Sequence, residues 1–391
     1  MNNFEYLVTT KIVFGRDVIT KTGEFVRNYH GDKVLLVHYG SGPVVESGII
    51  DKVKESLNSS DISFTEFGGV QPNPRLSLVY QGIQVAKREG VNFILAVGGG
   101  SVIDTGKAIA AGVMDDGDVW DFFIGSRQVT AALPIGVVLT IPAAGSEAGE
   151  TSVITNDANK LKRDFTTEIV RPKFAIMDPA LTFTLPADQT AYGVCDIMAH
   201  VMERYFSNVE FTELTDRLCE AVLKTLIHNL PIAREKPDDY AARAEIMWAG
   251  SLAHNGLLST GRIDDWASHT IEHELSGEFD IVHGAGLSII FPAWMQYVYK
   301  KRVDQFCRFA VRVWGVEYDP VSPQRTALEG IHRSIDFFKE NGLPTRLSNL
   351  GIGDDKLAML SERIFYDANG EIGNFVKLNK NDVLAIYNLA L

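Results

Sequence analysis

Two groups of residues in the second half of the chain have the types and spacing of metal ligands. Asp196 and His200 are four positions apart in a stretch patterned as a helix. That spacing places both side chains on one helix face, with Cβ atoms about 6 Å apart. His269 and His273 have the same spacing, and His283 follows ten positions later at the start of the next expected helix. One carboxylate with several imidazoles favours Fe²⁺ or Zn²⁺ over Mg²⁺ or Ca²⁺.

Chance and ordinary packing offer another interpretation of these residues. A D-x-x-x-H pair is a weak motif by itself, and most histidines in proteins are solvated or packed rather than bound to metal. Three of the nine histidines, however, fall within fifteen residues, in a segment otherwise patterned as amphipathic helix. We therefore predict that these residues share one metal site.

A glycine-rich segment in the first half of the chain is suited to binding phosphate. Gly98-Gly99-Gly100-Ser101 lies between an expected strand and an expected helix that carries Asp104. Glycines let the backbone approach a pyrophosphate closely, and the helix N-terminus offers free N–H groups and the positive end of its dipole. The spacing differs from the G-x-G-x-x-G fingerprint of the Rossmann domain. The alternative is a tight glycine turn in which Ser101 caps the helix.

Two other segments have compositions suited to the same binding region. Residues 140–150, TIPAAGSEAGE, follow a strand with small residues and a second Gly-Ser pair. Residues 71–74 form a rigid Gln-Pro-Asn-Pro turn beyond another strand. Ligands of open parallel sheets bind beyond the carboxyl ends of the strands, which is where all three segments fall. We therefore predict a cofactor site at that edge of the sheet.

The elements expected in the first half place these segments on a parallel sheet. Apolar strands are expected at 33–38, 62–67 and 93–97, and amphipathic helices at 44–57 and 75–89. Strands that alternate with helices through short loops form a parallel sheet with helices on both faces. The first part of the chain is therefore predicted to be an α/β domain.

The pattern changes twice in the rest of the chain. Between 134 and 179 it is rich in short strands, and beyond Leu185 it is helical. Helices are expected at 188–206, 212–229, 239–258 and 324–340. Because Leu185-Pro186 separates the two patterns, we predict an α/β domain over residues 1–185 and an all-helical domain over residues 186–391.

Composition limits the classes of protein to which the chain can belong. The 391 residues are 46% hydrophobic and 22% charged, which is ordinary for a globular protein. A formal net charge of -13 without a basic cluster argues against nucleic-acid binding. No apolar run reaches the length of about 18 residues that a membrane span needs. Three scattered cysteines, and a start that lacks a signal-peptide pattern, favour a cytoplasmic protein.

Several motifs follow one another along the chain: GGGSVIDTGK, PAAGSEAGETSVIT, FAIMDPALTFTLP, the D-x-x-x-H helix and an H-x-x-x-H segment that nine residues separate from a third histidine. Together they resemble the motifs of the iron-containing alcohol dehydrogenases, in particular the branch of butanol dehydrogenases and NADPH-dependent aldehyde reductases. Several ordered matches are far more specific than any one of them. The resemblance runs from Thr10 to Gly284 and weakens after residue 310.

The resemblance implies a fold and a set of site residues. The fold is a Rossmann-like parallel-sheet domain followed by an all-α domain, as in dehydroquinate synthase-like proteins. The family's metal ligands fall on Asp196, His200, His269 and His283. His273 matches a catalytic histidine that lies near the nicotinamide and substrate and relays a proton. The dinucleotide contacts fall on Gly40, Ser41, Gly98, Gly99, Gly100, Ser101, Asp104, Thr140, Lys162 and Leu181.

The segment after the first sheet strand predicts which dinucleotide is preferred. NAD-preferring members of the family tend to carry an acidic residue there, where this chain has Tyr39-Gly40-Ser41-Gly42. Because no carboxylate would repel a 2′-phosphate, we expect NADP(H) to be favoured over NAD(H). Pro43 departs from the serine of the related reductases, and Glu46 is unfavourable to a phosphate.

The resemblance implies a metal-dependent oxidoreductase, commonly a homodimer, that exchanges a hydride between NAD(P)(H) and a small primary alcohol or aldehyde. Iron and zinc both accept the expected ligand set. Polyol oxidation, as in glycerol dehydrogenase, is an alternative. A dehydroquinate synthase-like cyclase is another, but its phosphorylated substrates want basic residues, and the metal segment DDWASHTIEHELSGEFD is acidic. A metal- or nucleotide-binding module without turnover is the remaining alternative.

Overall fold

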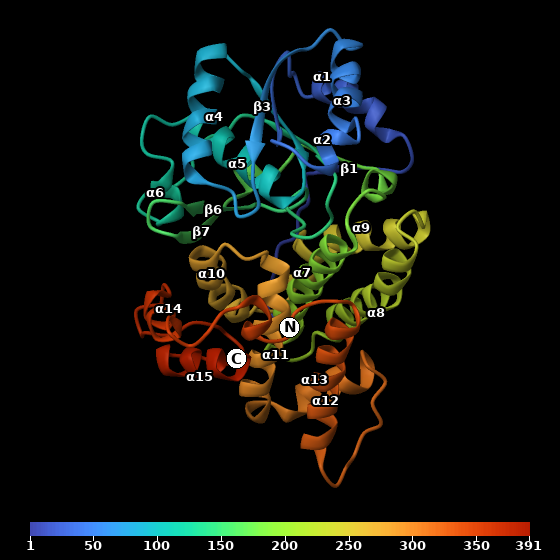
Figure 1. Ribbon diagram of the computed structural model, residues 1–391, viewed down its shortest axis with the longest axis vertical. Coiled ribbons are helices and arrows are strands. Elements are labelled where there is room, and N and C mark those ends of the chain that lie inside the picture. The colour runs from blue at the N-terminus through green and yellow to red at the C-terminus, as the bar shows by residue number, and fades with distance from the viewer. The chain divides into compact units, whose positions relative to one another are not determined.

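The computed structural model describes all residues, 1–391, and they form two compact units (Figure 1). The α/β unit comprises Leu7–Pro186 and Lys236–Asn255, and the helical unit comprises Met1–Tyr6, Ala187–Glu235 and Gly256–Leu391. Two short segments, Met1–Tyr6 and Lys236–Asn255, thus belong to the opposite unit from the one that a single division near residue 185 would give them. None of the helices combines the length and the apolar character needed to cross a lipid bilayer.

Six parallel strands form the main sheet of the α/β unit. In spatial order they are β1 (Lys11–Phe14), β8 (Phe174–Met177), β5 (Ile135–Leu139), β4 (Phe93–Gly98), β2 (Lys33–Tyr39) and β3 (Ser63–Val70). Every neighbouring pair is parallel. The chain proceeds from β2 outward to β3, and from β4 to β5 in the opposite direction, so the order reverses between β2 and β4. Open sheets bind ligands at such a switch point.

Helices cover both faces of this sheet, which confirms the predicted architecture. The helices of the unit are α1 (Thr22–Asn28), α2 (Pro43–Glu46), α3 (Ile49–Asn58), α4 (Leu76–Glu89), α5 (Gly100–Val113), α6 (Trp120–Phe123) and α9 (Tyr240–His254). Figure 1 shows α1 and α3 on one side of the sheet, and α4 and α5 on the other. Along β4, Phe93, Leu95 and Val97 pack in the core beneath α1 and α3, while Ile94 and Ala96 pack in the core beneath α4 and α5.

The helix expected at 44–57 differs in the structure, and the short strands expected between 134 and 179 divide between two sheets. The helix expected at 44–57 is interrupted at Gly48, whose φ of 76° is left-handed and ends one helix before the next begins. The strands β6 (Thr151–Asn156) and β7 (Leu161–Thr166) form a separate antiparallel hairpin rather than joining the main sheet. An isolated bridge between Arg75 and Thr155 attaches this hairpin to the turn that follows β3.

Helix α9 belongs to the α/β unit although it is distant in sequence. Ser251 donates a hydrogen bond to the buried Glu147 carboxylate in the loop after β5. The guanidinium carbon of Arg16 lies 3.9 Å from the centroid of the Tyr240 ring. These long-range polar and cation–π contacts attach α9 to the α/β unit.

The helical unit is built around one helix that is buried on all sides. Its helices are α7 (Ala187–Tyr205), α8 (Glu213–Glu235), α10 (Ala267–Phe279), α11 (His283–Val298), α12 (Val303–Arg312), α13 (Pro323–Glu340), α14 (Leu357–Arg363) and α15 (Lys380–Ala390). Every residue of α11 from Gly284 to Met295 is buried. A helix that is apolar around its whole circumference must lie inside a bundle, and α11 packs against α7, α10 and α15.

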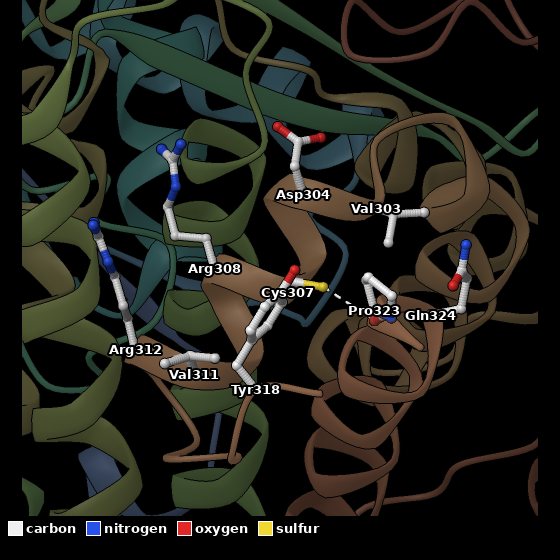
Figure 2. A pocket seen from close by; sticks show the side chains of 9 residues that line it. All are labelled: Val303, Asp304, Cys307, Arg308, Val311, Arg312, Tyr318, Pro323 and Gln324. Atoms are coloured by element: carbon white, nitrogen blue, oxygen red, sulfur yellow. Dashed lines mark hydrogen bonds between the residues drawn. The ribbon is translucent and has the colours of Figure 1, made fainter. Parts of the chain in front are cut away.

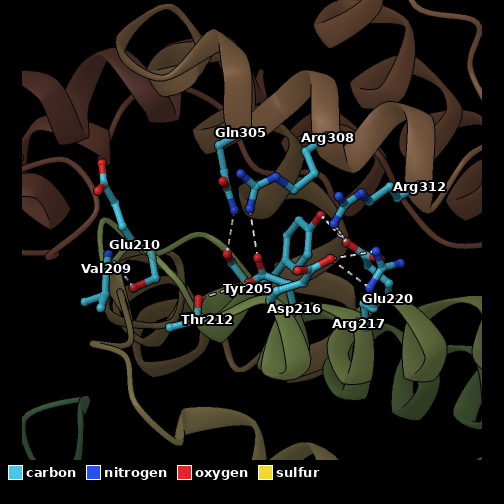
Figure 3. Close-up of polar contacts among 12 residues, drawn as sticks. Tyr205, Val209, Glu210, Thr212, Asp216, Arg217, Glu220, Gln305, Arg308 and Arg312 are labelled. Carbon is cyan, nitrogen blue, oxygen red and sulfur yellow. Dashed lines mark hydrogen bonds and ion pairs between the residues drawn. The ribbon is translucent and has the colours of Figure 1, made fainter. Parts of the chain in front are cut away.

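Ion pairs join α8 to α12 in the same unit (Figure 3). Arg308 donates to Asp216 over 2.8 Å, and Arg312 donates to Glu220 over 3.2 Å. The Tyr205 hydroxyl donates to the same Glu220 carboxylate over 3.0 Å. Because both carboxylates are buried, these contacts supply the partners that buried charges require.

Candidate active site

In the helical unit, three of the four predicted metal ligands lie close to one oxygen atom of the fourth. Asp196 Oδ1 lies 3.6 Å from His200 Nδ1 and 3.7 Å from His269 Nε2. His283 Nε2 lies 3.7 Å from the same oxygen. Asp196 and His200 come from α7, His269 from α10, and His283 is the first residue of α11. The structure therefore brings together four residues that span 88 positions of sequence.

The spacing of these atoms fits a bound metal better than it fits hydrogen bonds. Hydrogen bonds between nitrogen and oxygen are about 2.7–3.2 Å long. Ligand atoms about 2.1 Å from a tetrahedral ion lie about 3.4 Å from one another. Asp196 Oδ1 and His269 Nε2 are buried and have no hydrogen-bond partner. A shared cation would satisfy both atoms, and the mixed carboxylate and imidazole donors suit Fe²⁺ or Zn²⁺.

Two glycines at the start of α11 allow His283 to reach this position. A Cβ atom at Gly284 would lie 2.1 Å from the Tyr192 carbonyl oxygen on α7. A Cβ atom at Gly286 would lie 2.3 Å from Glu272 Oε1 on α10. A side chain at Gly284 would therefore push α11 away from the backbone of α7 and move His283, whereas one at Gly286 would displace the Glu272 side chain.

Two buried glutamates behind the histidines were not predicted. Glu203 Oε1 lies 2.8 Å from His269 Nδ1, and Glu272 Oε2 makes a short contact with His283 Nδ1. Both glutamates are 0% exposed. A signal for Glu203 was available, because it follows Asp196 and His200 at helical spacing on the same face. The partner of Glu272 lies on another helix, and no sequence spacing indicates it.

The electrostatic field of the cluster favours a positive charge. Burial disfavours the protonated imidazole of His269, but the carboxylates of Asp196 and Glu203 outweigh burial and raise its pKa to about 9. The cysteine beside the cluster behaves differently, because burial and then the charge of Asp196 raise the pKa of the Cys195 thiol well above its usual value. Cys195 therefore stays protonated and is a poor metal ligand.

His273 lies beside the ligand cluster rather than within it. It is on α10, one helical turn beyond His269, and its ring centroid is 5.4 Å from that of His283. Its side chain is partly exposed, whereas His200 and His269 are buried. His273 therefore lies next to the ligands and is also open to solvent, which is a position that suits proton exchange.

The predicted phosphate-binding residues meet at the carboxyl edge of the main sheet. Gly40-Ser41 follows β2, Gly98-Gly99 ends β4, and Thr140 follows β5. The Thr140 N–H donates to the Gly98 carbonyl over 3.1 Å. The Thr140 hydroxyl is buried without a hydrogen-bond partner, which leaves a polar group for a ligand to satisfy. Gly40 and Ser41 are exposed.

The glycine-rich segment is pressed against its neighbours. A Cβ atom at Gly99 would lie 2.8 Å from Ile141 Cβ and 3.0 Å from the Tyr39 hydroxyl. That hydroxyl accepts the Gly99 N–H over 3.2 Å, and burial raises the pKa of Tyr39 to about 12. The alternative interpretation, in which Ser101 caps the following helix, is wrong: Gly99 is the N-cap and α5 begins at Gly100. Because Ser101 is already inside the helix, its backbone cannot adopt the extended cap conformation.

Asp104 and Lys107 on α5 point under the loop after β5 rather than toward solvent. Lys107 Nζ donates to the Ser146, Gly149 and Thr151 carbonyls over 2.8, 3.0 and 2.9 Å. Asp104 accepts from the Ser146 hydroxyl over 2.6 Å. Burial raises the pKa of Asp104 to about 6 and lowers that of Lys107 to about 8, and in each case the partner's charge opposes the effect. The pair therefore holds the loop in place from inside.

The last two predicted cofactor residues lie in different surroundings. Lys162 on β7 is buried and donates to Asn73 Oδ1 over 3.1 Å. Asn73, in the Gln-Pro-Asn-Pro turn, has a φ of 51°, which is left-handed and which asparagine tolerates better than most residues. Leu181 lies in a short 3₁₀ helix (Pro179–Thr182) and packs into the core beneath α1 and α3.

A separate pocket of about 620 Å³ lies along α12 and contains none of the predicted site residues (Figure 2). Figure 2 shows Arg308 and Arg312 extending from α12 away from Pro323 and Gln324. Both arginines are paired with carboxylates of α8, and the Cys307 thiol donates to the Pro323 carbonyl over 3.1 Å. These two arginines and the cysteine are thus engaged within the protein.

Comparison with known proteins identifies the family. The model of the family described as iron-containing alcohol dehydrogenase matches residues 9–179, and that of the Fe-containing alcohol dehydrogenase family, C-terminal, matches residues 190–391. The chain belongs to the iron-containing alcohol dehydrogenase family. It is therefore an oxidoreductase of alcohols and aldehydes that uses NAD(P)(H) and a divalent metal. The match to the last residue corrects the expectation that the resemblance weakens after residue 310.

Relatives of this alcohol dehydrogenase cover nearly its whole length. It is 42% identical over 388 residues to the NADH-dependent butanol dehydrogenase A of Clostridium acetobutylicum, with 99% of each chain covered. It is 35% identical over 368 residues to the NADPH-dependent aldehyde reductase YqhD of Escherichia coli, with 93% of each covered. The crystal structure of NADH-dependent butanol dehydrogenase A from Thermotoga maritima superposes with a TM-score of 0.96 at 41% identity and covers 99% of that chain. These relatives confirm the expected fold and the expected branch of the family.

Proposed function

We propose that this alcohol dehydrogenase reduces small aldehydes to primary alcohols, and catalyses the reverse reaction, at a metal centre formed by Asp196, His200, His269 and His283. One observation carries the proposal: Asp196 Oδ1 lies 3.6–3.7 Å from a nitrogen of each of the three histidines. That arrangement supports a single shared ion and explains why two of the buried atoms have no other partner.

The chain's own residues have distinct tasks in this reaction. A divalent ion bound at the four ligands supplies Lewis-acid polarisation of the substrate oxygen, and the nicotinamide supplies or accepts the hydride. Asp196 and the three histidines hold the ion and exclude water from its buried side. His273, partly exposed and next to His283, passes the proton between the substrate oxygen and solvent through a ring nitrogen.

We propose that the α/β unit, which contains most of residues 1–185, binds the dinucleotide. The backbone N–H groups at the start of α5 suit the pyrophosphate, because a 14-residue helix presents its positive dipole end there. The unpartnered Thr140 hydroxyl and the ammonium of Lys162 are further polar contacts. Gly40 and Ser41 bind the adenosine end. Asp104 acts on the cofactor indirectly, through the loop that it supports.

The choice between the two dinucleotides is a finer proposal. Absence of a carboxylate from Tyr39 to Gly42 supports NADP(H), as does the name of the Escherichia coli relative. The names of the relatives from Clostridium acetobutylicum and Thermotoga maritima, at 42% and 41% identity, support NADH. We propose that the adenosine end tolerates a 2′-phosphate, so that the ratio of kcat/KM for NADPH to that for NADH is at least one.

The cell compartment and the oligomeric state are also proposals. The free, buried cysteines Cys195, Cys219 and Cys307 support a reducing, cytoplasmic environment. A homodimer is what the family resemblance implies. Size-exclusion chromatography with light scattering tests the dimer directly.

Metal content and turnover in two histidine variants test the proposed function. NAD(P)H consumption with butyraldehyde is followed after loading the purified protein with Fe²⁺ or Zn²⁺. His269→Ala should lose the metal and all activity. His273→Ala should keep the metal and lose roughly 10²–10⁴-fold in kcat, the usual size of a general acid–base contribution. Full metal content and full activity in both variants would show that the site assignment is wrong.

A substrate panel tests the alternatives. Butyraldehyde and other short aldehydes should be reduced with higher kcat/KM than glycerol is oxidised. Preference for glycerol would replace the aldehyde reductase proposal with polyol oxidation. Turnover of a phosphorylated sugar would favour the cyclase class instead.

A further inference from the structure

The two glutamates behind the metal cluster contact the histidines in the same way. Glu203 Oε1 lies 2.8 Å from Nδ1 of His269, and Glu272 Oε2 contacts Nδ1 of His283. In each histidine, the opposite ring nitrogen, Nε2, is the one that lies 3.7 Å from Asp196 Oδ1. An imidazole that donates its Nδ1 proton to a carboxylate has its Nε2 lone pair directed at the cluster.

Each glutamate is itself held in place by other groups. Glu203 also accepts the backbone N–H groups of Trp266 and His269 over 2.7 and 3.1 Å, across the start of α10. Glu272 also accepts the Ser276 hydroxyl. Both side chains are 0% exposed, so neither can turn away to reach water. The carboxylates are therefore fixed with respect to the imidazoles.

The combined charge of the cluster favours a bound cation. The cluster contains three buried carboxylates, those of Asp196, Glu203 and Glu272, and each of them lies beside an imidazole. Burying carboxylates in this way is costly unless positive charge offsets them. A divalent ion bound at Nε2 of His269 and His283 would offset two of the three negative charges.

We propose that Glu203 and Glu272 are positioning residues that hold His269 and His283 with Nε2 directed at the ion and supply negative charge that increases its affinity. This inference rests on the proposed function, because it assumes that the four ligands bind one ion. Outer carboxylates of this kind usually change metal affinity about 10- to 100-fold when removed. Glu203 should contribute more, since the His269 side chain is 7% exposed and that of His283 is 23% exposed.

A second ion is the alternative role for Glu272. Glu272, His273 and His283 form another group whose potential ligand atoms lie within 4.8 Å of one another. His283 Nδ1, however, already contacts Glu272 directly, which leaves no room for an ion between the two atoms. The proposal therefore requires one ion for each chain. A measured stoichiometry of two would overturn the assignment of Glu272.

Zinc affinity of the full chain tests the proposal. The dissociation constant is measured by competition with a chromophoric chelator for the wild type, Glu203→Gln and Glu272→Gln. Glutamine keeps the size of the side chain and an acceptor for the Nδ1 proton, but removes the charge. We expect about 10- to 100-fold weaker Zn²⁺ binding in both variants, with the larger loss in Glu203→Gln. The melting temperature of the metal-free variants shows that they fold.

Glu274→Gln is the matched control. Glu274 is buried on the same helix as Glu272, but its carboxylate pairs with Arg363 over 2.5 Å rather than with an imidazole. Its substitution should leave Zn²⁺ affinity unchanged. The absorption spectrum of bound Co²⁺ provides a second readout, because it depends on the geometry of the ligands and a merely structural role would not change it. Glu203→Gln and Glu272→Gln should alter this spectrum, and Glu274→Gln should not.

The outcomes separate failure of this inference from failure of the proposed function. If the wild type binds Zn²⁺ no better than Asp196→Ala does, the metal site itself is wrong. If Asp196→Ala loses Zn²⁺ binding while both glutamine variants keep the wild-type affinity and Co²⁺ spectrum, the site stands and the positioning role is overturned. An equal loss in Glu274→Gln would also overturn it, because the effect would then be general to buried charge on α10.

Discussion

The helical unit and the α/β unit both bury charged side chains beside their candidate binding residues, but they balance the charge differently. In the helical unit, three carboxylates surround imidazoles, and the field is negative enough to raise the pKa of His269 to about 9. In the α/β unit, Asp104 lies next to Lys107 and both bind the same loop. We propose that a cation from outside completes the first arrangement, whereas the second is complete within the chain.

This difference indicates how each site is prepared for its ligand. The loop after β5 is held by an internal cation, so it can keep its shape before a dinucleotide binds. Around the metal ligands, the carboxylates of Asp196 and Glu203 favour a positive charge, and without an ion they favour a proton on His269 instead. Organisation of the metal cluster should therefore depend on the ion, and organisation of the dinucleotide edge should depend on buried residues of the chain.

The largest effect should come from removing the internal cation. Lys107→Met leaves Asp104 buried without its charged partner and frees the carbonyls of the loop. Breaking a buried pair in this way costs about 3–5 kcal/mol. Chemical denaturation should show a loss of that size, and KM for the dinucleotide should rise. A variant with wild-type stability would show that the α/β unit does not depend on its internal charge.

The pH dependence of stability tests the same pair. Burial raises the pKa of Asp104 from 3.8 to about 6, despite the opposing effect of Lys107. The folded chain thus binds the proton more tightly than the unfolded chain does. The stabilising contribution of Asp104 is complete below pH 3.8 and is lost as the pH rises through about 6.

The matched comparison is between the wild type and Asp104→Asn, which has no proton to bind at this position. The stability of the wild type relative to the variant should increase by up to about 3 kcal/mol as the pH falls from 7 to 4, since one pKa unit corresponds to about 1.36 kcal/mol. Denaturation curves at pH 7, 5.5 and 4 measure this change. A difference that does not vary with pH would contradict the prediction.

Metal removal should destabilise the helical unit by a comparable or smaller amount. A ligand that binds only the folded state stabilises it by about 2.7 kcal/mol at 100 times its Kd. Thermal melts with Zn²⁺ and with a chelator should differ accordingly for the wild type. Asp196→Ala provides the control, because its melting temperature should not respond to Zn²⁺. Identical melts of the wild type in both conditions would contradict the prediction that the metal cluster, unlike the loop after β5, depends on a bound ion.

The smallest effect should come from the hydroxyl behind the glycine-rich segment. Tyr39→Phe removes the acceptor of the Gly99 N–H, and one hydrogen bond of this kind contributes about 1 kcal/mol. We expect a rise of a few-fold in KM for the dinucleotide, with kcat for butyraldehyde and Zn²⁺ affinity unchanged. A change in Zn²⁺ affinity would show that the two sites are not independent.

Local pattern was sufficient to predict much of the architecture. The alternation of apolar strands and helices predicted the parallel sheet with two covered faces, and the expected helix at 188–206 corresponds to α7 (Ala187–Tyr205). Spacing of four residues predicted that Asp196 and His200 share a face, and they do. The helix expected at 44–57 was wrong, although Gly48 was a local signal against it. Gly48 is left-handed, and a left-handed residue ends a helix even where the amphipathic pattern continues.

The sequence by itself predicted most of the elements, the types of the candidate ligands and the family, because these depend on residue identity and on spacings shorter than one helix. Only the tertiary structure decided that Glu203 supports a histidine 66 positions away, that Lys107 reaches a loop about forty positions away, and that α9 belongs with the sheet. Those contacts join residues through space, and no period in the sequence encodes which two surfaces will meet. Burial then gives them their effect, since a carboxylate or an ammonium without water interacts strongly with whatever the fold places beside it.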